Sequence, residues 1–140
     1  MQIEIREYQS SDYPELVTLL QKVYGSTIDK NILEGNYISD CRSIIVAVTE
    51  DSLVGCAFEE VQVDYVRPSR VLFVTYVAVD EEYRKHGIGR KLFAFIENSC
   101  SEKNCSSIEL TSADFRKEAH AFYTALGFTK KKTTVFIKEI

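Results

Sequence analysis

A basic turn with two glycines separates an apolar run from a helical pattern in residues 77–93, VAVDEEYRKHGIGRKLF. Gly87 and Gly89 flank a single isoleucine at the expected start of the helix. N–H groups at a helix start have no intrahelical acceptor and carry partial positive charge, so they attract anions. The neighbouring full positive charges are Arg84, Lys85 and Arg90. This spacing predicts an anion site; the alternative is a flexible turn in a solvated run of charges.

Two common phosphate motifs are missing from this turn. The dinucleotide fingerprint needs a third glycine where the chain has Leu92, and no GxxxxGK(S/T) string occurs. A third pattern fits. The hexapeptide RKHGIG, with Arg84, Gly87 and Gly89, resembles the Arg/Gln-x-x-Gly-x-Gly/Ala pyrophosphate loop of the GNAT-type N-acetyltransferase superfamily. Residues 119–128, AHAFYTALGF, resemble the AxxFYxxxGF segment that commonly closes the acetyl-CoA site in that family.

The resemblance covers essentially the whole chain and implies acetyl-CoA as the acetyl donor. Tyr123 matches the family tyrosine that often donates a proton to the departing thiolate. A free thiol has a pKa of about 8.5 and a tyrosine about 10, so this transfer is feasible. The alternative for Tyr123 is a core aromatic in a helical apolar stripe. The residues implied to bind acetyl-CoA are Val77, Ala78, Val79, Arg84, Lys85, His86, Gly87, Ile88, Gly89, Arg90, Arg116 and Tyr123.

Two positions depart from the family pattern. Arg116 stands where many members have Asn, so the usual amide hydrogen bond is replaced by a cation. Thr75 stands where many members have a carboxylate, and a threonine cannot act as a general base at neutral pH. The base is therefore unassigned. Candidates for the base or the acceptor site are Glu59, Glu60, Asp64, Thr75 and His120, each of which could instead be an ordinary solvated or structural side chain.

The leading function is transfer of acetyl from acetyl-CoA to a primary amine of a small molecule, by direct attack in a ternary complex. The carboxylates at positions 59, 60 and 64 favour a cationic acceptor. One alternative is acetylation of a protein or peptide amine. Another is a noncatalytic acetyl-CoA-binding sensor, which the missing base supports and Tyr123 opposes.

The elements that position these residues follow from local patterns. The strands expected are IEIREY, SIIVAV, LVGCAFEEVQVDYV, VLFVTYVAV, SSIEL and TTVFIKEI. The helices expected are SSDYPELVTLLQKVY, a weaker piece over residues 30–38, residues 87–103 and FRKEAHAFYTALGF. In the third strand the apolar residues change parity, which predicts a bulge near Glu59 and Glu60. The result is one mixed α/β (α+β) domain over residues 1–140, with a mostly antiparallel central sheet, one parallel strand–helix–strand crossover and flanking helices.

Composition narrows the function classes. The 140 residues are 45% hydrophobic and 27% charged with net charge −4, which argues against a nucleic-acid binder. No signal peptide or run of ~18 apolar residues is visible, so a cytoplasmic protein without a membrane partner is expected. The four cysteines lack a CxxC spacing and are expected to be reduced and mostly buried, and a metal site has little support. The expected partners are a small amine and, at most, a second copy in a homodimer.

Overall fold

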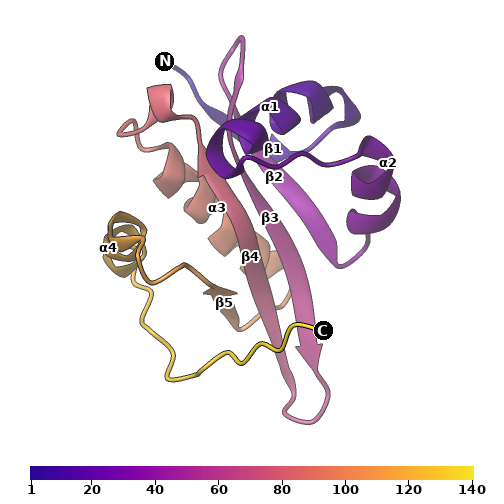
Figure 1. Cartoon of the computed structure of the whole chain (residues 1–140), viewed down its shortest axis with the longest axis vertical. Coiled ribbons are helices and arrows are strands. Elements are labelled where there is room, and N and C mark those ends of the chain that lie inside the picture. Colours follow the sequence, from indigo (N-terminus) through magenta and orange to yellow (C-terminus); the bar gives the residue numbers. More distant parts are fainter.

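Five strands form one mixed sheet in the computed structural model, which describes residues 1–140 (Figure 1). The strands are β1 (Glu4–Glu7), β2 (Arg42–Val48), β3 (Leu53–Asp64), β4 (Ser69–Val79) and β5 (Ser107–Leu110), in the spatial order β1-β2-β3-β4-β5. The pairs from β1 to β4 are antiparallel, and β5 runs parallel to β4. The predicted mixed sheet with one parallel crossover is confirmed.

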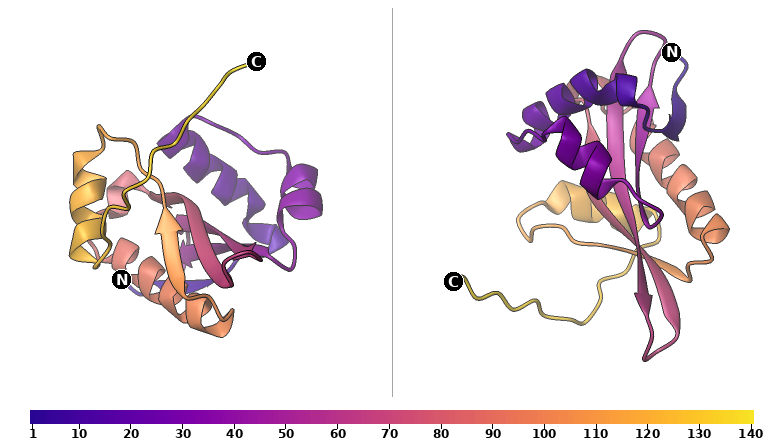
Figure 2. Two further views of the ribbon diagram at one scale, coloured as in Figure 1. Left: turned by 90° about the horizontal axis from the view of Figure 1, so that it is seen from below. Right: turned by 90° about the vertical axis from the view of Figure 1, so that its right-hand side faces the viewer.

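Helices cover both faces of this sheet. They are α1 (Tyr13–Tyr24), α2 (Lys30–Ile32), α3 (Ile88–Glu102) and α4 (Lys117–Ala125), and α2 runs directly into a π-helical turn at Leu33–Tyr37. Figures 1 and 2 show α1 and α2 on one face and α3 on the other, with α4 beside β5. Each face has its own apolar core, one around α1 and one around α3. None of the helices combines the length and apolarity needed to span a membrane.

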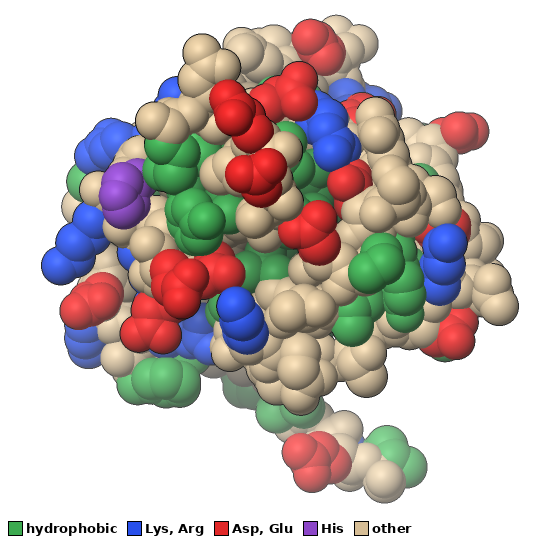
Figure 3. Space-filling model, turned by 90° about the horizontal axis from the view of Figure 1, so that it is seen from above, with side chains coloured by type: hydrophobic (Ala, Val, Ile, Leu, Met, Phe, Trp, Pro, Cys, Tyr) green, Lys and Arg blue, Asp and Glu red, His purple; other side chains and the backbone are tan.

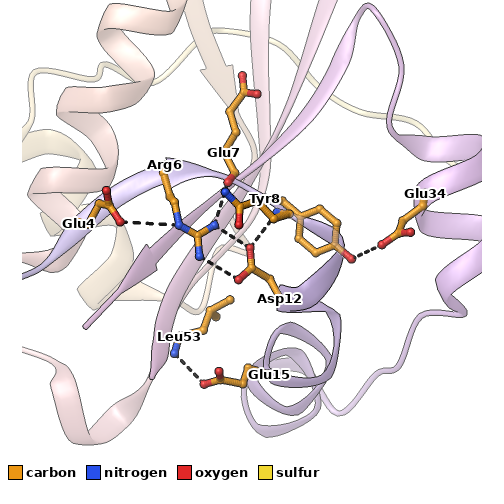
Figure 4. Close-up of polar contacts among 9 residues, drawn as sticks. Glu4, Arg6, Glu7, Tyr8, Asp12, Glu15, Glu34 and Leu53 are labelled. Carbon is orange, nitrogen blue, oxygen red and sulfur yellow. Dashed lines mark hydrogen bonds and ion pairs between the residues drawn. The ribbon is translucent and has the colours of Figure 1, made fainter. Parts of the chain in front are cut away.

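A polar network fastens α1 to the sheet (Figure 4). Arg6 of β1 donates two hydrogen bonds to the Asp12 carboxylate, at 2.7 and 2.9 Å, and the Gln9 N–H donates a third at 2.8 Å. The hydrogen bonds from Arg6 lower the pKa of Asp12. Further along α1, the Glu15 carboxylate accepts the Leu53 N–H of β3 at 2.8 Å. These contacts fix helix α1 to two strands, β1 and β3, and thereby set the position of its last residue, Tyr24.

The register of β3 shifts in two places, against β2 at Ala47–Val48 and against β4 beyond Cys56, and neither shift lies at the predicted place near Glu59 and Glu60. Cys56 pairs with Ala78 and Phe58 with Thr75, so one residue of β3 faces two residues of β4. One of these two, Tyr76, has φ 49°, which is left-handed. A non-glycine residue in that region costs about 1–3 kcal/mol and often marks a functional site.

The prediction of a bulge near Glu59 and Glu60 was wrong because it assumed that β3 buries only one face. Both residues stay in register with β4. Every residue from Leu53 to Glu59 is buried, since α1 covers one face and α3 the other. Apolar side chains are therefore needed on both faces of this part of β3, and a change of face between successive apolar residues does not require a bulge.

The predicted final strand, TTVFIKEI, does not form within the chain. Residues 129–140 have no strand partner and all their side chains are exposed. Figure 2 shows this segment extending away from the domain. An ion pair between Lys131 and Glu109 of β5, at 2.6 Å, joins the start of this segment to the sheet.

The cysteines are all free thiols. Cys56 is buried, Cys41 is exposed, and Cys100 and Cys105 are partly buried. The expectation that most are buried therefore holds fully for Cys56 alone.

Candidate active site

The turn before α3 adopts a conformation that glycine favours. Gly87 is the N-cap of α3 with φ 78°, and Lys85 is also left-handed with φ 65°. The His86 ring nitrogen Nδ1 lies 2.9 Å from the Arg84 carbonyl oxygen and 3.1 Å from that of Tyr83, which braces the turn. Backbone N–H groups in such turns converge on one side and form concave anion sites.

The start of α3 has the electrostatics of an anion site. No side chain caps its first N–H groups, and its first turn contains no acidic residue. The three cations of this turn, Arg84, Lys85 and Arg90, are all exposed. A 15-residue helix presents partial positive charge at this end, so an anion here would meet both free N–H donors and full charges. These residues fit the pyrophosphate loop expected from the sequence.

The two glycines of the turn have different structural roles. Nothing lies within 4 Å of a Cβ built on Gly87, so its requirement is the left-handed backbone. A Cβ on Gly89 would lie 2.9 Å from Cζ of Phe122 in α4. Gly89 therefore allows α3 to pack closely on the Phe122 ring. The sequence interpretation assigned both glycines to anion approach and missed this contact, since it joins residues 33 positions apart.

Strand β4 has an unpaired backbone edge beside this turn. Its pairing with β5 ends at Val74 and Leu110, so the remainder of β4 has no strand on that side. The Val77 carbonyl accepts a hydrogen bond from the Tyr24 hydroxyl at 2.8 Å, and the Val79 carbonyl accepts a longer one from Arg84 Nε at 3.4 Å. Val77, Ala78 and Val79, which the family resemblance implied to bind acetyl-CoA, therefore lead directly toward the basic turn.

Tyr123 is both a packed ring and a free hydroxyl. Its ring centroid lies 5.8 Å from that of Phe93, 5.6 Å from Phe122 and 5.8 Å from Phe128. The Tyr123 hydroxyl makes no side-chain hydrogen bond within the chain. It is nevertheless not a buried, unpartnered polar atom, since Glu59 Oε2 is the one such atom, so the Tyr123 hydroxyl is accessible to solvent. Burial raises the pKa of Tyr123, and the nearby Arg116 cation opposes that rise. The aromatic cluster fixes the ring and leaves the hydroxyl free to act.

Arg116 and Tyr24 connect α4 to α1 across β4. The Arg116 guanidinium lies 5.6 Å from the Tyr24 ring centroid, and the Tyr24 ring packs edge-on against Tyr76 at 5.2 Å. Burial raises the pKa of Tyr24, and Arg116 again opposes the rise. Sequence reasoning missed Tyr24 and Tyr76. The available signal for Tyr24 was its place as the last residue of a helix, directly before a left-handed Gly25.

The three carboxylates expected near the acceptor do not form one cluster. Glu59 is 1% exposed and points toward α3, where Lys103 Nζ lies 3.4 Å from its Oε1. Glu60 lies on the other face of β3 and pairs with Arg42 at 3.5 Å. Asp64 accepts two backbone N–H groups of the β3–β4 hairpin turn, at 2.9 and 3.1 Å.

Thr75 and His120 occupy structural positions. Thr75 is half-buried in β4 opposite Phe58. The His120 ring nitrogen Nε2 lies 3.0 Å from the Ala113 carbonyl, which braces the connection before α4. The Tyr24 hydroxyl donates its hydrogen bond to the Val77 carbonyl, and no hydrogen bond joins the Tyr24 or Tyr123 hydroxyl to a carboxylate or an imidazole. The structure thus places no evident base beside these two phenols.

Acidic side chains gather on the end of the molecule that carries this turn (Figure 3). Glu15, Asp80 and Glu82 help to line a depression of about 240 Å³ between α1 and the end of β4. Lys22 pairs with Asp80 there at 3.3 Å. This acidic depression repels anions, so the basic turn is the part of this surface that suits a phosphate group.

Known proteins similar to this chain include several acetyltransferases. Residues 3–128 match the acetyltransferase (GNAT) family. Homo sapiens N-acetyltransferase 8B is 26% identical over 109 residues, which are 77% of this chain and 48% of that protein. Aminoglycoside N(6')-acetyltransferase type 1 of Salmonella typhimurium is 22% identical over 120 residues, 82% of this chain and 83% of that protein. This chain therefore spans about half the length of the human relative and most of the bacterial one.

Solved structures share the fold. AAC(6')-Iy in complex with the bisubstrate analogue CoA-S-monomethyl-acetylneamine matches with a TM-score of 0.87 at 19% identity, over 100% of this chain and 99% of that chain. An acetyltransferase of Trypanosoma brucei matches with a TM-score of 0.83 at 22% identity, over 99% of this chain and 100% of that chain.

Proposed function

Because the chain belongs to the acetyltransferase (GNAT) family, we propose that it transfers the acetyl group of acetyl-CoA to a primary amine of a small molecule. The observation that carries this proposal is the continuous run of polar groups from the free edge of β4 to the uncapped start of α3. Acetyl-CoA has an amide-bearing arm and a pyrophosphate. A strand edge pairs with amides, and a basic helix start holds a pyrophosphate.

Two observations support a small amine as the acceptor. The relative from Salmonella typhimurium, of which this chain covers most, is an aminoglycoside N(6')-acetyltransferase. At the β4 bulge, Tyr76 is 50% exposed, and its ring lies 5.2 Å from Tyr24 and 5.5 Å from Phe58 between centroids. Aromatic faces attract ammonium groups by about 0.5–2 kcal/mol. An amine bound here would lie beside the unpaired part of β4.

Tyr123 would supply the proton that the reaction needs. The amine nitrogen attacks the thioester carbonyl carbon, a C–N bond forms, and the C–S bond breaks. The departing thiolate takes the Tyr123 hydroxyl proton, and the nitrogen releases one proton to solvent, from which Tyr123 is reprotonated. The raised pKa of Tyr123 keeps the hydroxyl protonated at neutral pH. Because the Tyr24 hydroxyl is committed to the Val77 carbonyl, an amine that arrives as an ammonium group would lose its proton to solvent before the neutral nitrogen attacks.

A panel of amines tests the proposal. Aminoglycosides, polyamines, amino acids, aminophosphonates and a lysine peptide are each incubated with the protein and acetyl-CoA. Release of free CoA thiol and the mass of the acetylated product are measured. We expect turnover with at least one small amine and less with the peptide. Preferred turnover of the peptide would indicate a protein acetyltransferase. Binding of acetyl-CoA with no release of free CoA thiol in the presence of any of these amines would indicate a sensor.

A further inference from the structure

Arg116 carries a positive charge that no carboxylate of the chain pairs with. It takes part in none of the ion pairs of the structure. Its guanidinium lies over two aromatic rings instead, 5.6 Å from the centroid of Tyr24 and 6.0 Å from that of Phe115. A guanidinium has five N–H donors, and contact with a ring face does not occupy them as a carboxylate does. Arg116 is exposed, so these donors can reach a bound molecule.

The contacts of Tyr24 place this guanidinium at the proposed reaction centre. The Tyr24 ring packs edge-on against Tyr76 at 5.2 Å, at the bulge of β4. The Tyr24 hydroxyl donates to the Val77 carbonyl at 2.8 Å, in the part of β4 that β5 leaves unpaired. Arg116 also opposes the rise in the pKa of Tyr123, so its charge acts on the proposed proton donor. An acceptor bound beside Tyr76 would therefore lie close to a guanidinium that has no partner carboxylate.

Two carboxylates on the α1 side of the sheet are engaged within the chain. Glu60 of β3 pairs with Arg42 at 3.5 Å. Glu34, in the π-helical turn, accepts hydrogen bonds from the hydroxyls of Tyr8 and Ser10, at 2.7 and 3.1 Å. A polyamine or an aminoglycoside brings several ammonium groups, and these need free carboxylates when binding removes their water. The contacts within the chain therefore favour an acceptor that brings an anion over one that brings several cations.

We propose that the acceptor is a small amine that also carries an acidic oxyanion, a carboxylate or a phosphonate, and that Arg116 binds this oxyanion. This inference rests on the proposed function and names its substrate class. The planar guanidinium can donate two parallel hydrogen bonds to such a group. The amine of the same molecule would lie toward the Tyr76 ring, whose face attracts an ammonium group. The acidic and basic ends of one small molecule would thus meet two side chains that both contact Tyr24.

Matched acceptors test the requirement for an anion. Each amino acid of the amine panel is compared with its carboxamide, and each aminophosphonate with its dimethyl ester, by release of free CoA thiol. Removal of the charge makes the amine less basic and raises its neutral fraction, so a preference for the acid cannot come from amine reactivity. We expect kcat/KM to favour at least one acid over its uncharged counterpart by about tenfold or more. The better of the two acid types identifies the oxyanion.

Variants at two adjacent positions test the assignment to Arg116. Arg116→Gln should raise the KM of the acidic acceptor by about 10–100-fold and leave the KM of acetyl-CoA and the kinetics of the uncharged counterpart unchanged. Arg116→Lys keeps the charge but loses the planar fork, so its KM should lie between those of the parent and Arg116→Gln. Lys117→Gln is the matched control, because Lys117 is also exposed and begins α4, and it should behave as the parent.

The possible failures are distinguishable. Turnover of uncharged or polycationic amines alone, or at least as fast as of the acids, would overturn this inference and leave the proposed function standing. A raised KM for acetyl-CoA in Arg116→Gln, with the acceptor KM unchanged, would assign Arg116 to the donor and would also overturn it. No thiol release with any amine would refute the proposed function and this inference with it.

Discussion

The contact between Gly89 and Phe122 can be tested by adding one methyl group. In Gly89→Ala the new Cβ would lie 2.9 Å from Phe122 Cζ, which is shorter than any ordinary carbon–carbon contact. The Phe122 ring cannot swing away freely, because its centroid lies 6.0 Å from Phe93 and 5.6 Å from Tyr123. Overpacking of this kind costs about 1–3 kcal/mol. For a chain of this length we expect the melting temperature to fall by roughly 3–10 °C.

A double-mutant cycle separates this packing role from ligand binding. Phe122→Leu shortens the ring side chain and should recover at least about 1 kcal/mol of the loss in the Gly89→Ala background, since the two residues are in contact. Gly87→Ala is the comparison variant. It meets no atom within 4 Å, so its cost is left-handed strain of about 1–2 kcal/mol that Phe122→Leu cannot relieve. The free energy of unfolding of the parent chain and of each variant is measured by denaturant titration. Additive effects of Gly89→Ala and Phe122→Leu would refute the packing role.

Three further predictions concern the site and the fold. Tyr123→Phe should lower turnover by about 10²–10⁴-fold with little change in acetyl-CoA affinity, measured by steady-state kinetics and calorimetry, and an unchanged rate would leave Tyr123 as a core ring. Arg84→Gln should weaken acetyl-CoA binding by roughly 10–100-fold, because one charged hydrogen bond is lost. Arg67→Gln, at the exposed hairpin, is the control and should have no effect. If the Arg84→Gln variant binds acetyl-CoA as tightly as the parent chain, the anion site lies elsewhere. Because the pKa of Asp12 is lowered in the folded state, its contribution should be complete above about pH 4 and lost as the pH falls through the folded value. Asp12→Asn should therefore lower the melting temperature at pH 7 and have a smaller effect at pH 3.

Elements defined by local patterns could be predicted from the sequence. Helix α1 combines Pro14 in its first turn with buried leucines at helical spacing, and it ends before a left-handed Gly25. The nearly all-apolar β4 is central because it has an antiparallel neighbour on one side and a parallel one on the other. The basic turn at Gly87 was predicted for the same reason, since a helix start and its charges lie within a few residues. In each case the determining interactions are local or depend only on burial.

Features that depend on distant contacts could not be predicted. The bulge at Tyr76 arises from the pairing of two whole strands, and parity along β3 alone pointed to the wrong residues. Glu59 looked like a surface carboxylate beside Glu60, but α3 covers it. The prediction of the final strand was wrong because strand propensity does not specify which neighbouring strand would pair with it. Its pattern in residues 133–140 is typical of a strand, yet no edge of the same chain receives it.

Arg116 links these distant contacts to the chemistry proposed for Tyr123. A phenol that donates a proton to a thiolate is a better acid when its pKa lies near that of the thiol, and burial among aromatic rings moves the pKa of Tyr123 away from that value. The Arg116 cation opposes this effect at Tyr123 and at Tyr24. Stacking on the Tyr24 ring at 5.6 Å holds the guanidinium beside the Tyr24 phenol, and the Tyr24 hydroxyl is itself held by the Val77 carbonyl. The same contacts that connect α1, β4 and α4 therefore also limit the rise in the pKa of the proposed proton donor.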